Sequence, residues 1–131
     1  MLATEWLQND LAIWPSGSIR SDQIFPKGIL TFKELFTIIQ FPDEIVQLWA
    51  PGHIIKKCLE NGLSCLPNTD GRFPQISGCT VKFDSTKPKF ERIISMKFWN
   101  KREFADDEIY KVVTSNFLAG GGDGYKWFTD P

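Results

Sequence analysis

Residues 116–124 read Asn-Phe-Leu-Ala-Gly-Gly-Gly-Asp-Gly and follow a run of β-forming residues over 109–115. A glycine-rich loop lets the backbone come close to a ligand, so this one could hold a phosphate, or it could be a tight turn. The stretch lacks the Lys-Ser/Thr ending of a P-loop, which excludes that type of nucleotide site. By itself the loop leaves the other two interpretations open.

Two further loops stand out earlier in the chain, and each directly follows an expected element of secondary structure. Ser-Gly-Ser-Ile-Arg at residues 16–20 follows the apolar run 11–14, and Gln-Phe-Pro-Asp at residues 40–43 follows a helical pattern. Loops that are held by rigid elements often carry binding residues. The three loops together are therefore the candidate site.

The first of two expected helices covers residues 32–40. It follows a capping box, in which the Thr31 hydroxyl accepts from the backbone N–H of Glu34 while the Glu34 carboxylate reaches back. Three apolar residues recur within it at helical spacing: Leu35, Ile38 and Ile39. This spacing predicts a helix with one buried face.

The second helix and the strands complete the expected fold. Pro51 suits the first turn of a helix and Gly62 suits its C-terminal cap, whereas residues 63–74 read as a loop. Five runs predict β-strands: residues 11–14, 44–50, 79–83, 91–99 and 109–115. This order predicts one α+β domain with a mixed sheet and two main helices.

The composition is that of one folded domain. The chain has 131 residues, 42% hydrophobic and 24% charged, with a net charge of -1. A nucleic-acid or membrane-surface partner would normally require a basic excess, so neither is expected. The longest apolar stretch, residues 29–41, contains Lys33 and Glu34 and does not predict a membrane span. The acidic start, with Glu5 and Asp10, predicts no signal peptide and leaves the compartment open.

The cysteine and histidine content argues against a metal centre on this chain. The three cysteines have no Cys-x-x-Cys spacing and are expected as small apolar residues near the core: Cys58, Cys65 and Cys79. The single histidine, His53, cannot supply a two-metal centre. It lies at the expected start of a helix, where a polar residue needs no functional role. We therefore expect neither a catalytic metal site nor a cofactor here.

In this order, the three loops resemble the C-terminal domain of the 5′-nucleotidase family, which includes UDP-sugar hydrolases and 2′,3′-cyclic-nucleotide phosphodiesterases. Residues 28–31, 71–78 and 107–113 support the resemblance, which runs from about residue 10 to residue 128. It implies a substrate-binding domain whose partner in the intact protein is a metallophosphoesterase domain with two divalent metal ions. Proteins of this family are often periplasmic or extracellular.

The resemblance also implies roles for individual residues. Phe41 and Phe117 would hold the base between their rings, and each stacking contact contributes ~1–3 kcal/mol. Asp123 would accept hydrogen bonds from ribose hydroxyls. Arg20 would reach the phosphate or ribose side with its charged guanidinium fork. Three further residues of the matching loops are expected at the site: Asp43, Asn116 and Gly122.

Each of these residues also has an ordinary structural interpretation. The chain contains eleven Phe and five Trp residues, so Phe41 and Phe117 could belong to the core. Asp123 could be a turn residue, and Arg20 could be a solvated surface residue. The match of all three loops to the family pattern favours the binding roles.

Two of the loops depart from the family pattern. Pro15 stands where the family usually has Asn, so that position has neither a side-chain amide nor an N–H donor. In the loop 40–43, Pro42 and Asp43 replace Gly-Asn, so Asp43 offers only acceptors. The departures leave the identity of the nucleotide open, while both expected aromatic residues are present.

Both ends of the chain are shorter than the family pattern, so we expect a domain truncated at both ends. Apolar surface would then be less covered around Trp6 and Trp127. The leading hypothesis is a nucleotide- or nucleoside-binding domain of a 5′-nucleotidase-like phosphoester hydrolase. The alternative is a non-catalytic remnant that acts as a protein-interaction module, and a stand-alone metal-dependent hydrolase ranks third. The oligomeric state stays open.

Overall fold

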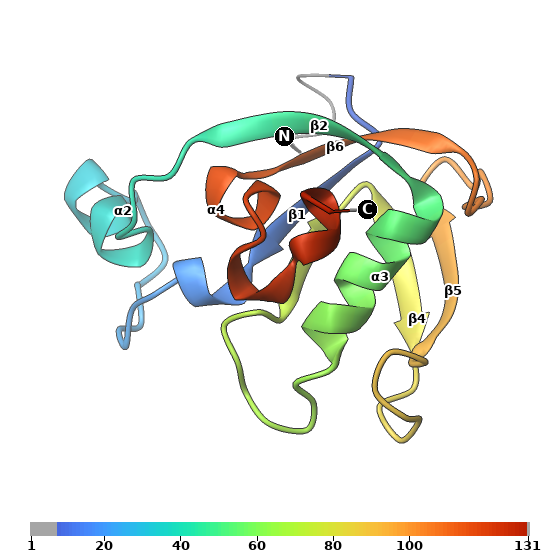
Figure 1. Cartoon of the computed structure of the whole chain (residues 1–131). Coiled ribbons are helices and arrows are strands. Elements are labelled where there is room, and N and C mark those ends of the chain that lie inside the picture. Colours follow the sequence, from blue (N-terminus) through green and yellow to red (C-terminus); the bar gives the residue numbers. More distant parts are fainter. Residues whose placement is uncertain (1–7, 131) are drawn as a thin grey trace.

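The computed structural model describes residues 8–130. These residues form an α+β fold, in which a helix and the C-terminal segments pack against one mixed sheet (Figure 1). The predicted fold class is therefore confirmed. No helix within residues 8–130 is long and apolar enough to cross a membrane. Trp6, one of the two residues expected near uncovered apolar surface, lies outside the described residues.

The main sheet has four strands in the order β2 (Ile45–Pro51), β6 (Ile109–Ser115), β1 (Leu11–Pro15) and β3 (Pro74–Ser77). β1 and β6 run parallel, with Leu11 opposite Val112, and the two outer strands are antiparallel to their neighbours. The carboxyl ends of parallel strands meet at one edge of a sheet. The loops that follow β1 and β6 therefore lie side by side, although they are far apart in the sequence.

Helix α3 (Gly52–Leu63) packs its apolar stripe against this sheet. The buried core contains residues from α3, the strands and the C-terminal segment, among them Leu11, Ile13, Ile54, Ile55, Leu59, Tyr110, Val112, Leu118 and Tyr125. Neither predicted end residue has its expected place: Pro51 is the N-cap and lies just before the first turn, and the helix continues past Gly62 to Leu63, with Ser64 as its C-cap. Gly62 is required for another reason, because a Cβ atom there would lie 2.6 Å from the Tyr125 hydroxyl.

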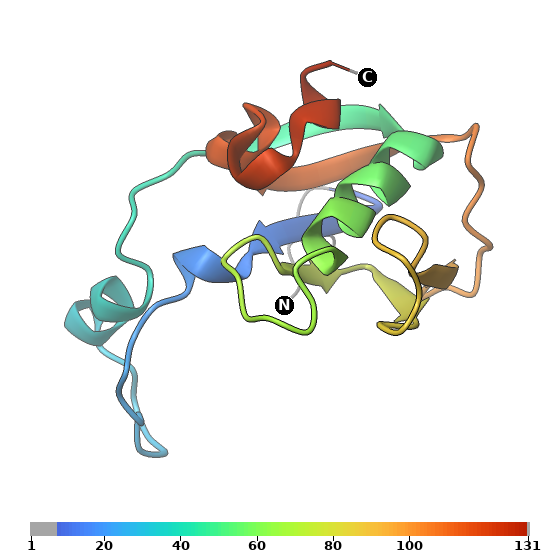
Figure 2. The ribbon, with the colours of Figure 1, turned by 60° about the horizontal axis from the view of Figure 1, so that its bottom comes forward.

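Helix α2 (Phe32–Ile38) differs most from expectation. Its capping box is present as predicted, but none of its residues is buried, so the predicted buried face is wrong. Phe32 is 80% exposed and Phe36 is 70% exposed. Figures 1 and 2 show the reason: α2 belongs to the segment between η1 and β2, residues 19–44, which extends away from the sheet as an arm. Helical periodicity predicts a face for packing, and residues 8–130 bring no buried core to that face.

The helix also ends before the predicted residue 40. The carbonyl of Ile38 accepts a hydrogen bond of 2.7 Å from the backbone N–H of Arg20. Next to it, Ile19 and Ile39 form an isolated antiparallel bridge. The end of α2 is thereby joined to the segment that follows β1.

The other strand predictions also need correction. β3 was not predicted, because it has only four residues, begins with Pro74 and follows a loop. A separate two-stranded sheet is formed by β4 (Cys79–Phe83) and β5 (Ile93–Phe98). β5 begins two residues later than the predicted 91–99, and the N–H of Arg92, just before it, donates to the Glu60 carboxylate of α3 instead of a strand.

Packing accounts for the cysteines, and hydrogen bonds to the loop before β6 account for the histidine at the start of α3. Cys58 and Cys79 are buried, as expected for small apolar residues, and Cys65 is half-buried; all three are free thiols. Burial raises the pKa of Cys58 to about 12. The backbone N–H of His53 donates 2.8 Å to the carbonyl of Asp106, and its ring Nδ1 lies 3.1 Å from the same oxygen.

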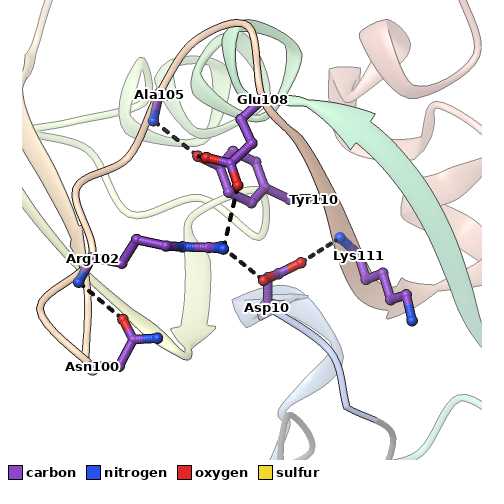
Figure 3. Close-up of polar contacts among 7 residues, drawn as sticks. All are labelled: Asp10, Asn100, Arg102, Ala105, Glu108, Tyr110 and Lys111. Atoms are coloured by element: carbon purple, nitrogen blue, oxygen red, sulfur yellow. Dashed lines mark hydrogen bonds and ion pairs between the residues drawn. The ribbon is translucent and has the colours of Figure 1, made fainter.

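The loop before β6 is fastened by Arg102 (Figure 3). Its guanidinium pairs with Asp10 at 2.9 Å and with Glu108 at 3.3 Å. The same group lies over the ring of Phe98, 4.6 Å from the centroid, and 5.2 Å from the centroid of Tyr110. Arg102 therefore joins this loop to the start of β1 and to the strand β6.

Candidate functional site

A hollow of about 610 Å³ opens at the edge of the sheet where β1 and β6 end. We call it the aromatic hollow, because three aromatic side chains line it: Trp14, Phe41 and Phe117. Five of the seven predicted site residues lie in its wall: Arg20, Phe41, Asp43, Phe117 and Asp123. The three loops chosen from the sequence thus converge on one site.

Phe41 and Phe117 enter the hollow from different elements. Phe41 follows the arm that carries α2, whereas Phe117 lies in the short helix α4 (Asn116–Ala119) directly after β6. Each of the two residues is 51% exposed, so neither is a core residue. Exposed aromatic rings that share one hollow can contact both faces of a flat ligand.

Phe117 is held by its backbone and by the loop beneath it. Its N–H donates a 3.0 Å hydrogen bond to Oδ2 of Asp43, and the N–H of Asn116 donates 2.8 Å to the carbonyl of Glu44. Asp43 therefore acts as an acceptor at the start of α4. Gly122 packs against the ring, because a Cβ atom there would lie 2.5 Å from two of its carbons.

Arg20 lies against Phe41. Its guanidinium carbon is 5.1 Å from the centroid of the Phe41 ring, and its Nε donates a 2.8 Å hydrogen bond to the carbonyl of Gly17. These two contacts leave the terminal nitrogen atoms of Arg20 without a partner among residues 8–130. The guanidinium can therefore bind an anionic or hydroxyl-bearing ligand while it stays over the ring.

Asp123 sits in the 3₁₀ turn η2 (Gly122–Gly124) with a backbone φ of 51°, in the left-handed region. Its carbonyl accepts a 2.9 Å hydrogen bond from the side-chain amide of Asn61 in α3. The carboxylate faces the loop around Gly71, since a Cβ atom on Gly71 would lie 3.9 Å from Asp123 Oδ2. A contact from the core helix thus fixes the backbone of a residue whose carboxylate lines the hollow.

The remaining two predicted residues do not line the hollow directly. Asn116 is exposed, and its contact with the site is the backbone hydrogen bond to Glu44 described above. Gly122 acts through the Phe117 ring that packs on it. Both positions therefore support Phe117, Gly122 through its lack of a side chain and Asn116 through its backbone N–H.

Several wall residues were not predicted as site residues: Trp14, Pro15, Asp70, Gly71 and Ser115. Hydrogen bonds from the backbone and side chain of Arg72 hold the pKa of the Asp70 carboxyl below its usual range. The backbones of Gly17 and Gly71 are in contact, because a Cβ atom on Gly17 would lie 2.8 Å from the α-carbon of Gly71. In the sequence, Asp-Gly at residues 70–71 predicts a turn, but it does not predict which part of the chain that turn will contact.

Metal ligands are not gathered at this site. Within residues 8–130, no three His, Cys, Asp or Glu side chains are placed together so that they could hold a metal ion. Three carboxylates line the hollow: Asp43 accepts from the N–H of Phe117, Asp70 accepts from the N–H of Arg72, and Asp123 is held through its backbone. The chemistry that these side chains offer is stacking, charge and hydrogen bonding.

The fold and the hollow define an α+β domain with an aromatic-lined candidate site. The model of the family described as "5'-nucleotidase, C-terminal domain" matches residues 2–130, so the chain belongs to this family. The chain is 33% identical over 124 residues to a trifunctional nucleotide phosphoesterase of Bacillus subtilis (strain 168), a match that covers 92% of this chain. It is 30% identical over 127 residues to an NAD 5'-nucleotidase of Haemophilus influenzae, covering 91% of this chain.

Solved structures show the same relationship. A 5'-nucleotidase precursor from Thermus thermophilus superposes with a TM-score of 0.89 and 30% identity, over 98% of this chain and 25% of that chain. The chain spans only 8% of the length of the Bacillus subtilis relative and 21% of that of the Haemophilus influenzae relative. The similarity therefore concerns one domain of much longer proteins.

Proposed function

We propose that this chain is the nucleotide- or nucleoside-binding domain of a 5′-nucleotidase-like phosphoester hydrolase. The observation that carries the proposal is the convergence of Phe41 and Phe117, both half-exposed, on one hollow. A base between the two rings gains stacking on both faces, and each stacking contact contributes ~1–3 kcal/mol. The names of the relatives, which are nucleotidases and a nucleotide phosphoesterase, support a ligand of this class.

The polar groups of the hollow fit the rest of a nucleotide. Asp123 offers carboxylate oxygens that can accept from the two ribose hydroxyls. The Arg20 guanidinium carries a permanent positive charge at the same wall and suits phosphate oxygens. In this proposal the domain binds and orients the nucleotide, and its own residues perform no bond cleavage.

Hydrolysis would then belong to a metallophosphoesterase domain in the intact protein. The two divalent metal ions of such a domain would supply an activated water and stabilise charge on the phosphate. Residues 8–130 contain no set of ligands that fits these ions. We therefore assign the metal-dependent step to the partner domain and none of it to this chain.

Titration of the chain with AMP, followed by calorimetry or ligand-observed NMR, tests the proposal. We expect saturable binding, and we expect Phe117→Ala to weaken it by about tenfold or more, because one stacking face is lost. Phe36→Ala is the matched control, since Phe36 is 70% exposed on α2 and does not line the hollow. Absence of saturable binding of both AMP and GMP at millimolar concentration, or equal binding by the Phe117 variant, would contradict the proposal.

The alternative is a protein-interaction module without nucleotide binding. The exposed apolar residues of the arm that carries α2 favour it. Ile24 is 98% exposed and Ile29 is 94% exposed, in the same segment of the chain as the exposed Phe32 and Phe36. Large apolar side chains exposed on one segment are candidates for an interaction site. The same titration separates the two proposals, because an interaction module would show no nucleotide binding that depends on Phe117.

A further inference from the structure

Asp43 is tied to both aromatic segments of the hollow. It follows Phe41 by two positions in the chain, and its Oδ2 accepts a 3.0 Å hydrogen bond from the backbone N–H of Phe117. Asp43 also lines the hollow together with both rings. A carboxylate is therefore held beside the space that the two rings share.

This carboxylate retains both charge and acceptor capacity. None of the ion pairs formed within residues 8–130 involves Asp43. Its hydrogen bond in that part of the structure is the one from Phe117, whereas a carboxylate has about four lone-pair sites. Hydrogen bonds to a charged acceptor are stronger than those between neutral groups. A ligand with N–H donors at this wall would thus be stabilised.

We propose that Asp43 makes the hollow selective for guanine nucleotides, an inference that rests on the nucleotide-binding role proposed above. Guanine carries two adjacent donors on its pairing edge, N1–H and the 2-amino group, and these match the two oxygens of one carboxylate. Oδ2 can accept from the base while it holds Phe117, because each oxygen has two lone pairs. The pair of rings supplies stacking, and Asp43 reads the edge.

The other bases match this carboxylate less well. Adenine and cytosine place a ring-nitrogen acceptor beside the amino group, so one lone pair of the base faces a carboxylate oxygen. Uracil has a single N–H between two carbonyl groups. Pro42, which precedes Asp43, has no N–H and cannot supply the donor that these acceptors lack. The hollow therefore favours guanine, and inosine monophosphate, which lacks the 2-amino group, should be intermediate.

Calorimetric titration of the full chain with GMP, IMP, AMP and 1-methyl-GMP tests this inference. In the unaltered chain, GMP should bind about tenfold or more tightly than AMP and 1-methyl-GMP, because a matched bidentate contact discriminates by that order. Asp43→Asn should remove most of the preference for GMP. Its amide oxygen can still accept from the Phe117 N–H, while its amide nitrogen presents donors to the base.

Asp107→Asn is the control for the change in charge, because Asp107 is exposed and does not line the hollow. This variant should keep the full preference for GMP. Equal binding of GMP and 1-methyl-GMP by the unaltered chain would overturn the role of Asp43, while leaving nucleotide binding established. If none of the four nucleotides binds saturably, the proposed function fails as well. The comparison within the unaltered chain decides the matter even where Asp43→Asn does not fold.

Discussion

The α-carbon of Gly122 lies against the ring of Phe117: a methyl group built on it would stand 2.5 Å from two of the ring carbons. Gly122 belongs to the turn η2, and Phe117 belongs to α4. The contact therefore packs the second part of the segment 116–124 against the first. The glycine is thus needed for space beside an aromatic ring, in a loop whose composition suggested a phosphate cradle or a simple turn.

Gly122→Ala should therefore displace the Phe117 ring and weaken nucleotide binding several-fold. The φ of Gly122 is not in the positive region that disfavours alanine, so the backbone accepts the change and the ring must move. AMP titration measures the loss, and the NMR signals of the Phe117 ring report the displacement without any ligand. Gly120→Ala is the matched control, because its new Cβ atom would meet a backbone carbonyl at 3.3 Å and no ring. Unchanged ring signals in Gly122→Ala would refute the contact.

Gly62→Ala should destabilise the domain, although alanine is the better helix former. Propensity alone favours alanine inside a helix by about 1 kcal/mol. The new Cβ atom of residue 62 would lie 2.6 Å from both the Tyr125 hydroxyl and Cδ of Pro74, and overpacking of this kind costs about 1–3 kcal/mol. Urea denaturation should show a lower free energy of unfolding, whereas Lys57→Ala on the exposed side of α3 should not. A more stable Gly62 variant would show that the helix end can shift.

Much of the fold was predictable because its signals are local. The capping box at Thr31 and the β-forming run of β6 depend on neighbours in the sequence, and the structure confirms them. The errors arise where distant residues decide. Gly62 reads as a cap until Tyr125 packs against it, and α2 has an apolar pattern that residues 8–130 leave exposed.

The same division holds for the candidate site. Arg20, Phe41 and Phe117 were identified from loops whose order follows a family pattern, and the parallel pairing of β1 and β6 brings two of those loops together. Asp70 and Gly71 were missed as wall residues, because their place depends on the contact between two glycine backbones, Gly17 and Gly71. A local sequence pattern can predict each of the two turns, but it cannot predict that they contact each other.

Acidification should open α2 locally before the rest of the domain. The backbone N–H and the hydroxyl of Thr31 each donate to Glu34 at 2.7 Å, which lowers the pKa of Glu34 below its usual value of 4.5. A carboxyl whose pKa is lower in the folded state contributes stability at pH values above 4.5, and that contribution is lost as the pH falls through the lowered folded value. Amide hydrogen exchange should accelerate in α2 over this range.

The control for acidification is Glu34→Gln. Glutamine can still accept from the Thr31 N–H but does not titrate, so exchange in its α2 should not change with protonation in that range once the intrinsic exchange rate is corrected. Because no residue of α2 is buried, the opening should leave the protection of β6 and α3 unchanged. Loss of protection in all elements at the same pH would show that Glu34 acts on global stability instead.

Arg102→Ala should lower the free energy of unfolding by about 1–2 kcal/mol, although its side chain is 42% exposed. Exposed ion pairs contribute little one at a time, so the pairs with Asp10 and Glu108 alone would give less than this. The guanidinium also lies over the rings of Phe98 and Tyr110, and this packing is lost together with the charge. Arg102→Lys keeps a positive charge but loses the planar guanidinium, so its free energy of unfolding should lie between those of the unaltered chain and Arg102→Ala. Lys89→Ala, an exposed residue elsewhere, should leave the urea midpoint unchanged. If Arg102→Lys were as stable as the unaltered chain, the positive charge alone would account for the contribution of Arg102.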